Sequence, residues 1–200
     1  YIATSFMEVS RDSKVYDTGM VTIIECMGRH AGWLTAAAAL ANTKGDGPDL
    51  IYVPEVDFDM DKFVADVKRI YGEKKNCLVA VSEGIHYADG TFVSEAKASG
   101  TDGFGHAQLG GLAARLADVV KAATGAKVRP IELSLLQRCA AHCASGTDMA
   151  ESFMSGKVAV ESAVSGITDK MVGFACTRDA NGYHCEPKLF DLSLVANTEK

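Results

Sequence analysis

The residues with the most evident chemical potential lie in the stretch ECMGRHAGWLTAAAALA, residues 25–41, which follows the apolar run VTII. A buried strand is expected to end here and an alanine-rich helix to begin. In an open α/β sheet, ligands bind beyond the carboxyl ends of the strands, where helix N-termini present free amide hydrogens. Gly28 would let the backbone approach a ligand, and Arg29 could grip a phosphate or a carboxylate. A tight turn with a solvated arginine is the alternative that spacing alone leaves open.

Three more charged residues stand at the ends of apolar runs. Glu83 closes the run CLVAVSE and is followed by Gly84, so its carboxylate is expected at the carboxyl edge of a sheet. There it could accept hydrogen bonds from sugar hydroxyls, whereas a cap for a helix or loop is the alternative. Arg129 and Arg138 flank the segment IELSLLQ, and they are either surface charges or two cations aimed at one phosphate.

Two further patterns are weaker. The segment GFGHAQLGG, residues 103–111, lacks both the dinucleotide fingerprint and the phosphate-loop pattern, so a loop with tight helix packing is favoured. Cys139, His142 and Cys143 resemble metal ligands, but a zinc site needs four, and no second Cys/His cluster lies at a suitable spacing. A metal site is therefore not expected. A Cys143 nucleophile beside His142 is a remaining alternative, although neighbours in sequence need not meet in space.

The elements that must position these residues alternate along the chain. Helical apolar spacing is present in four segments, with Asp57 or Asp59 as N-cap of the second and Ser145 with Asp148 at capping-box spacing in the last. The alternation predicts an α/β fold, a Rossmann-like layered and largely parallel sheet with helices on both faces. The predicted strands are 21–26, 50–56, 77–84, 128–136 and 171–176, and the predicted helices are 34–41, 59–72, 108–122 and 148–164.

Composition excludes several classes of function. A net charge of −6 without a basic block argues against nucleic-acid binding and against binding to anionic membranes. No run approaches the roughly 20 apolar residues of a membrane span. The six cysteines lie mostly in apolar runs, which is typical of buried thiols in a reducing compartment, so we expect the cytoplasm. The opening segment YIATSFMEV has helical character without a capping residue, and we expect the chain to be part of a longer protein.

Four blocks of sequence resemble the phosphofructokinase family in their order and in their residues. They are MGRHAGWLTAAAALA, VPEV, VSEG and LQR. The likeness is closest to the bacterial pyrophosphate-dependent or mixed-donor branch and covers essentially the whole chain. It implies phosphoryl transfer from pyrophosphate or ATP, with Mg²⁺, to the C1 hydroxyl of fructose 6-phosphate in glycolysis. Residues 1–200 would form the acceptor-binding portion of a partial phosphofructokinase fold, without the donor-binding N-terminal region and the extreme C-terminus.

The resemblance also implies roles for individual residues. Met27, Gly28 and Arg29 would contact the sugar and the reacting phosphoryl group, with Arg29 as the catalytic charge stabiliser. Glu83 would bind a sugar hydroxyl. Arg129 and Arg138 would grip the 6-phosphate of fructose 6-phosphate or of fructose 1,6-bisphosphate. Arg129 would do so in the site of a neighbouring subunit, which implies a homo-oligomer at full length, whereas His30 receives no role.

This chain departs from the family pattern at several points. Leu135 stands where many members carry His or Tyr, and Met20 stands where members with shared sites carry an interface arginine. The Gly-Gly-Asp donor loop and the Thr-Ile-Asp-Asn-Asp segment with its general base are absent from these residues. We therefore expect most Mg²⁺ ligands to lie outside this chain, and the isolated chain to bind ligand weakly and to turn over little or not at all. A non-catalytic sugar-phosphate-binding module on the same fold is the alternative.

Overall fold

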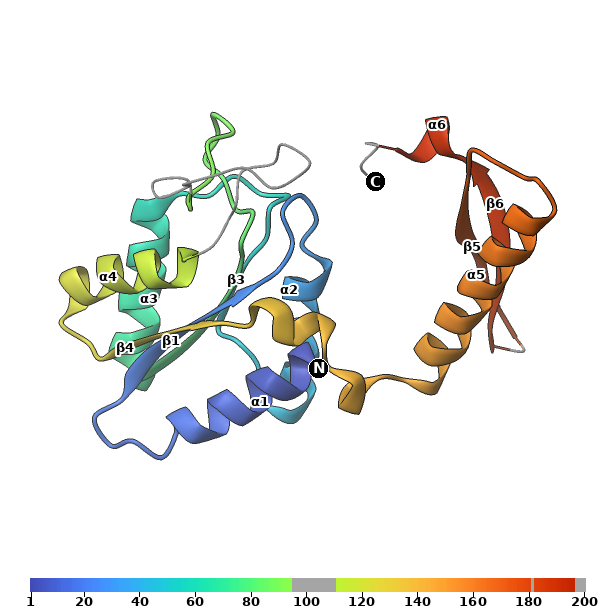
Figure 1. Ribbon diagram of the computed structural model, residues 1–200. Helices are drawn as coiled ribbons and strands as arrows, with labels where there is room; N and C mark the ends of the chain where they lie inside the picture. The colour runs from blue at the N-terminus through green and yellow to red at the C-terminus, as the bar shows by residue number, and fades with distance from the viewer. Residues whose placement is uncertain (95–110, 181, 197–200) are drawn as a thin grey trace. The chain divides into compact units, whose positions relative to one another are not determined.

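The computed structural model describes residues 1–94, 111–180 and 182–196 of the chain (Figure 1). These residues divide into two compact units, Tyr1–Ala140 and Ala141–Lys200. Of the glycine-containing segment 103–111, only the last residue belongs to the described part.

The first unit is built on a parallel sheet of four strands in the order β2-β3-β1-β4. All seven residues of the central strand β1 are buried, as expected for a strand covered on both faces. The parallel sheet predicted from the alternation of elements is thereby confirmed for these strands. Their bounds are Met20–Cys26 for β1, Leu50–Tyr52 for β2, Asn76–Ser82 for β3 and Val128–Glu132 for β4.

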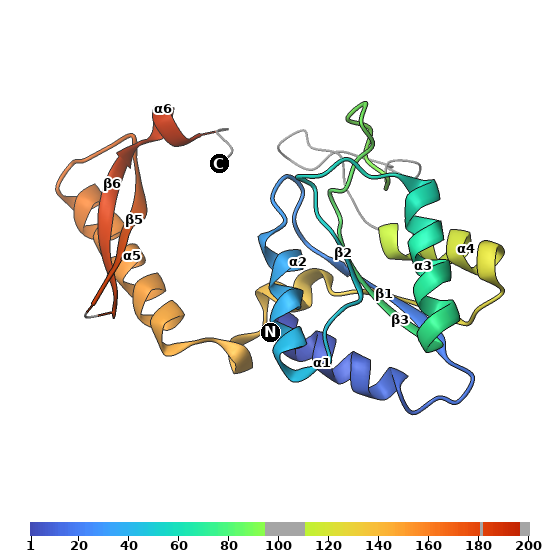
Figure 2. The same cartoon turned by 180° about the vertical axis from the view of Figure 1, so that it is seen from behind.

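Helices cover both faces of this sheet, as predicted (Figures 1 and 2). One hydrophobic core joins α3 and α4 to the side chains of Val21 and Ile23 in β1. The other core joins α1 and η1 to Ile24 and Cys26, which point to the opposite face because side chains alternate along a strand. The helices are α1 Ile2–Ser13, α2 Trp33–Ala37, η1 Ala38–Lys44, α3 Met60–Lys74 and α4 Leu112–Thr124.

Local chemistry explains where two of these elements begin and end. The side chain of Asp59 accepts a hydrogen bond from the Lys62 amide at 2.9 Å, so Asp59 is the N-cap of α3, one of the two candidates in the sequence. The predicted strand 50–56 is shorter than expected, because β2 ends at Tyr52 and Pro54 has no amide hydrogen for a ladder.

The predicted strand 128–136 is wrong in its second half. β4 ends at Glu132, and the 3-10 helix η3 runs over Ser134–Arg138. The Leu133 amide donates to the carbonyl of Glu25 at 3.1 Å, beyond which Ser134 takes a φ of 43° that no strand accommodates.

The second unit contains a long helix and an antiparallel hairpin. α5 spans Gly146–Val164, and the Ser145 side chain accepts from the Asp148 amide at 2.9 Å, as the capping-box spacing predicts. The predicted strand 171–176 exists within β5, Lys170–Asp179, but its place in a parallel sheet is wrong, because β5 pairs antiparallel with β6, Gly182–Asp191. The remaining short helices are η4 Ala141–Cys143 and α6 Leu192–Val195.

Burial of the cysteines differs from the expectation. Cys26 and Cys77 are buried in the first unit, whereas Cys139, Cys143 and Cys176 are exposed and Cys185 is half-buried. None of the described residues after Ala140 is buried, so an apolar run in that unit does not imply a core position.

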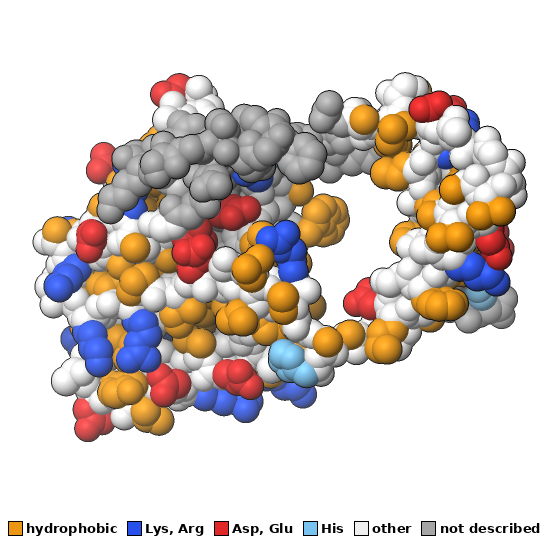
Figure 3. All heavy atoms as spheres, viewed as in Figure 1, with side chains coloured by type: hydrophobic (Ala, Val, Ile, Leu, Met, Phe, Trp, Pro, Cys, Tyr) orange, Lys and Arg blue, Asp and Glu red, His pale blue; other side chains and the backbone are white. Residues whose placement is uncertain are grey.

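Two features bear on the charge distribution and on the length of the helices. On the face of the first unit in Figure 3, basic and acidic side chains are interspersed. Among the described residues, no helix has the length and apolar character needed to cross a membrane.

Candidate functional site

The carboxyl ends of three parallel strands meet at one edge of the sheet. In the strand register, Cys26 of β1 lies opposite Ser82 of β3, and Glu25 lies opposite Glu132 of β4. The Glu83 amide donates to the carbonyl of Cys26 at 2.9 Å, which extends the pairing one residue past the end of β3. The segments that follow β1, β3 and β4 therefore start side by side.

Gly28 is held between two residues of the neighbouring strand end. Its amide donates to Oε1 of Glu83 at 3.1 Å, and its carbonyl accepts from the Ser82 hydroxyl at 2.5 Å. Its φ of +145° is one that L side chains rarely adopt, and a Cβ there would lie 2.5 Å from the Ala31 carbonyl oxygen. The structure thus brings two predicted site residues, Gly28 and Glu83, into direct contact.

Arg29 follows on the same corner. Its backbone packs so closely on Gly84 that a Cβ on this glycine would overlap the Arg29 carbonyl group. Its side chain is half-buried. His30, which has no predicted role, has its ring centroid 6.1 Å from that of Phe92.

Gln137 joins η3 to this corner, and sequence reasoning missed its role. Its Oε1 accepts from the Met27 amide at 3.2 Å, while its Nε2 donates to the Ser134 carbonyl at 3.2 Å. The same side chain therefore fixes the backbone of a predicted site residue and the segment that ends in Arg138. Its position inside the LQR block was the available signal.

Glu25 is the second residue that sequence reasoning missed. Its side chain is only 2% exposed, and its Oε2 accepts from the Ala113 amide at 2.8 Å. Gly111, the N-cap of α4, has no side chain for capping, so Glu25 satisfies an orphan amide of that helix from β1. The signal was a carboxylate inside the buried run VTIIEC.

Burial raises the pKa of Glu25 to about 7, and the negative charges of Glu132 and Glu83 act in the same direction, while the Ala113 amide opposes them. Its Oε1 is buried without a hydrogen-bond partner among the described residues. The carboxyl edge thus contains a group that exchanges its proton near neutral pH.

A pocket of about 110 Å³ opens at this edge. Its carboxylates accept hydrogen bonds, so the pocket suits a ligand with several hydroxyl groups better than a phosphate group, which needs cations. The pocket is lined by Glu25, Cys26, Met27, Glu83, Glu132 and Ser134.

The two predicted phosphate-binding arginines lie in different surroundings. Arg138 is exposed at the end of η3, next to Gln137. Arg129 lies opposite Thr22 within the sheet, three residues or about 10 Å before the end of β4, and its guanidinium donates to Asp12 of α1 at 3.3 Å. A phosphate contact of Arg129, including one in a neighbouring subunit, stays a prediction.

The two departures from the family pattern have different environments. Met20 is 1% exposed at the start of β1, so its side chain belongs to the core. Leu135 is 59% exposed on η3, near Gln137 in sequence, and presents an apolar group where a hydrogen-bonding one was expected.

The described residues do not form a group of three His, Cys, Asp or Glu side chains arranged to hold a metal ion. This includes the carboxylates of the pocket as well as Cys139, His142 and Cys143 near η4.

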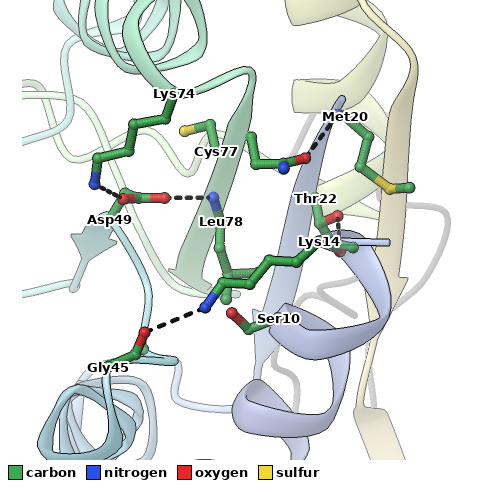
Figure 4. Close-up of a pocket in the computed structure, with 12 residues that line it drawn as sticks. Ser10, Lys14, Met20, Thr22, Gly45, Asp49, Lys74, Cys77 and Leu78 are labelled. Atoms are coloured by element: carbon green, nitrogen blue, oxygen red, sulfur yellow. Dashed lines mark hydrogen bonds and ion pairs between the residues drawn. The ribbon is translucent and has the colours of Figure 1, made fainter. Parts of the chain in front are cut away.

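A larger pocket of about 330 Å³ lies at the opposite, amino edge of the sheet (Figure 4). Lys74 pairs with Asp49 at 2.6 Å, and Asp49 also accepts from the Leu78 amide at 2.9 Å, a chain of contacts that Figure 4 shows. Lys14 pairs with Asp46 at 2.7 Å. These lysines therefore tie helices to the loop before β2.

Comparison with known proteins gives consistent matches along the chain. A family model described as Phosphofructokinase matches residues 2–162. Two curated relatives are pyrophosphate–fructose 6-phosphate 1-phosphotransferases, from Halomonas elongata at 41% identity and from Xanthomonas campestris at 42%. Both alignments cover 100% of this chain and 48% of the relative, so the chain spans about half the length of these proteins.

Solved structures give the same match. A pyrophosphate-dependent phosphofructokinase from Marinobacter aquaeolei superposes with a TM-score of 0.76 at 35% identity, over 100% of this chain and 46% of that protein. A pyrophosphate-dependent phosphofructokinase from Nitrosospira multiformis also superposes with a TM-score of 0.76 at 35% identity, over 100% of this chain and 46% of that protein.

Proposed function

Because this chain belongs to the phosphofructokinase family, we propose that it supplies the sugar-phosphate site of a 6-phosphofructokinase. The parent enzyme would transfer a phosphoryl group from pyrophosphate, or alternatively ATP, to the C1 hydroxyl of fructose 6-phosphate. The observation that carries the proposal is the hydrogen bond between the Gly28 amide and Glu83, which joins the Met27–Gly28–Arg29 corner to the carboxylate at the end of β3.

The site divides the work between carboxylates and cations. Glu83 and the acidic pocket would accept hydrogen bonds from sugar hydroxyls, and Arg138 would neutralise the 6-phosphate. Arg29 would stabilise the charge on the transferring phosphoryl group, because this reaction depends mainly on positioning and electrostatic stabilisation. Gly84 permits the close approach of the Arg29 backbone, and the neighbouring residue Glu83 accepts from the Gly28 amide.

Mg²⁺ would enter with the phosphoryl donor and neutralise its phosphates. The described residues offer no ready ligand set for the ion, so its ligands are proposed to lie mainly outside this chain.

We further place the parent enzyme in the cytoplasm as a homo-oligomer. The Arg129 side chain is 41% exposed and lies away from the carboxyl edge of its own sheet. A role in the site of a neighbouring subunit would suit that position. Fructose 1,6-bisphosphate would be the product, and neither a nucleic acid nor a membrane is proposed as a partner.

Calorimetry with fructose 6-phosphate tests the assignment on the 200-residue chain. Arg138→Ala is expected to weaken binding about tenfold or more, because a charge-assisted hydrogen bond contributes about 1.5–3 kcal/mol. Glu83→Gln should weaken sugar binding while leaving competition by inorganic phosphate nearly unchanged.

Arg69→Ala is the matched control, since Arg69 pairs only loosely with Asp66 at 3.6 Å and with Glu73 at 3.9 Å on the surface of α3. Its affinity should equal that of the unmodified chain. Absence of heat at millimolar fructose 6-phosphate, or an equal loss in Arg69→Ala, would count against the proposal.

A non-catalytic sugar-phosphate-binding module is the second candidate, because the contacts assigned above serve the acceptor rather than the donor. Turnover of fructose 6-phosphate with pyrophosphate or ATP by the full-length protein distinguishes the two. Tight binding without turnover would favour the module.

A further inference from the structure

Two cysteines face each other across the hairpin of the second unit. Cys176 of β5 lies directly opposite Cys185 of β6, and their Sγ atoms are 3.5 Å apart. Directly opposed residues of an antiparallel pair have Cα atoms about 4.5 or 5.5 Å apart and side chains on one face, and both distances lie within the range that disulfides adopt. Forming a bond therefore needs only a small movement of the side chains.

The two thiols differ in access and environment. Cys176 is exposed, whereas Cys185 is half-buried. The hydroxyl of Tyr183 lies 3.3 Å from Cys176 Sγ, on the same face of β6 as Cys185 because the two residues are two positions apart. Because Cys176 is exposed, it is the more accessible attacking group. Burial raises the pKa of Cys185 and lowers its thiolate fraction, which disfavours Cys185 as the first nucleophile.

The remaining cysteines provide a contrast within the same chain. Burial raises the pKa of Cys26 and of Cys77 to about 12, so both are poor nucleophiles in the folded state. Cys139 and Cys143 are exposed and four residues apart, at and just before η4 rather than opposed across a ladder. Exposure alone does not distinguish Cys176 from these two; its position opposite Cys185 does.

We propose that Cys176 and Cys185 form a reversible dithiol–disulfide site, which reacts with small disulfides of the glutathione type. The thiolate of Cys176 attacks one sulfur of the small disulfide, forms a mixed disulfide and releases one thiolate. The thiolate of Cys185 then attacks Cys176 Sγ and displaces the second small thiolate. Two protein thiols are oxidised, one small disulfide is reduced to two thiols, and the two protons pass to the leaving thiolates.

The bond would act on a unit that has little core of its own. None of the described residues after Ala140 is buried, and a two-stranded hairpin is only marginally stable in water. A covalent link between β5 and β6 would hold their register. Hydrogen exchange of the β5 and β6 amides is therefore expected to slow on oxidation, while exchange in β1 and β3 stays unchanged.

The test equilibrates the folded chain with mixtures of reduced and oxidised glutathione, traps free thiols by alkylation, and maps disulfides by peptide mass spectrometry. We expect the Cys176–Cys185 link to be the first intramolecular disulfide and to disappear on return to reduced glutathione. Cys176→Ser should abolish the link, and the Cys139→Ser/Cys143→Ser double variant should leave it unchanged.

Urea provides the control for geometry, because the preference for this pair should be lost in the unfolded chain. A Cys139–Cys143 link that forms first in the folded chain would overturn the proposal. The proposal would also be overturned if Cys176 and Cys185 were still free thiols, and therefore alkylated, in excess oxidised glutathione. The same order of disulfide formation in urea would overturn it as well. None of these measurements depends on binding of fructose 6-phosphate, so the proposed function is tested separately.

Discussion

Among single residues, Glu25 has the most consequential environment. Its carboxyl is buried at the carboxyl edge of the sheet, with one oxygen bound to the Ala113 amide and the other unpartnered among the described residues. Burial favours the neutral form, and the adjacent charges of Glu83 and Glu132 favour it further. The residue that anchors the start of α4 therefore also responds to pH.

This environment predicts a specific dependence of stability on pH. The pKa of Glu25 is raised from 4.5 to about 7, so between these values the folded chain keeps a proton that the unfolded chain releases. The contribution of Glu25 to the free energy of unfolding is therefore present below about pH 4.5 and lost as the pH rises through 7. At about 1.4 kcal/mol per pKa unit, the loss is on the order of 3 kcal/mol.

Glu25→Gln tests this prediction, because glutamine keeps an oxygen for the Ala113 amide and does not titrate. Urea unfolding between pH 4.5 and pH 8.5 should show a flatter dependence for this variant, which becomes the more stable chain at the alkaline end. Glu73→Gln is the control, because Glu73 is 61% exposed on α3 and its charge is not one of those that raise the pKa of Glu25. Parallel curves for Glu25→Gln and the unmodified chain would show that Glu25 does not hold the proton.

Gly84 leads to a second prediction at the same edge. A Cβ there would overlap the Arg29 carbonyl, so Gly84→Ala must displace the Arg29 corner or the end of β3. Overpacking of this kind typically costs about 1–3 kcal/mol. Thermal or urea unfolding should show that loss.

Gly72→Ala is the matched control for Gly84→Ala. Gly72 lies within α3, and a Cβ there meets nothing within 4 Å. Alanine should stabilise that helix by roughly 0.5–1 kcal/mol. If both variants shifted stability in the same direction, the close contact between Gly84 and Arg29 would not be the reason.

At the scale of elements, periodicity predicted the strands and helices of the first unit well. Buried parallel strands appear as apolar runs, and α3 shows its stripe through the buried side chains of Phe63, Val67 and Ile70. β6 was not predicted because GYHCEPKLFD is not a continuous apolar run like the buried strands, and Pro187 argues against a strand although a hairpin edge tolerates it. The alternation of apolar and polar residues in YHCEPKL was the signal for a half-buried strand.

The candidate site was likewise predictable only where its residues lie at strand ends. Met27, Gly28 and Glu83 could be predicted as site residues because strand ends are visible in sequence, and the structure places Gly28 against Glu83. Gln137 and Glu25 were missed because their importance depends on tertiary hydrogen bonds. Gln137 bonds to Met27, 110 residues away in the sequence, and Glu25 bonds to Ala113, 88 residues away. No local pattern encodes such pairings.

At the scale of the whole molecule, the two units differ in what stabilises them. Both hydrophobic cores consist of residues before 140. Gly28, Glu83 and Arg138 of the candidate site also lie in this first unit. The second unit has a capped helix and a paired hairpin but no buried side chain among its described residues. Folding of the first unit should therefore not require the second.

A chain cut after Ala140 tests this division. Residues 1–140 should unfold cooperatively in urea, with a free energy of unfolding within about 1 kcal/mol of that of the same transition in the whole chain, because the buried apolar area is retained. Residues 141–200 alone should show no cooperative transition, since a hairpin and one helix without a core are marginal in water. Circular dichroism and the urea m-value measure both. Cooperative unfolding of residues 141–200, or its loss in residues 1–140, would mean that stability is shared between the units rather than concentrated around the parallel sheet.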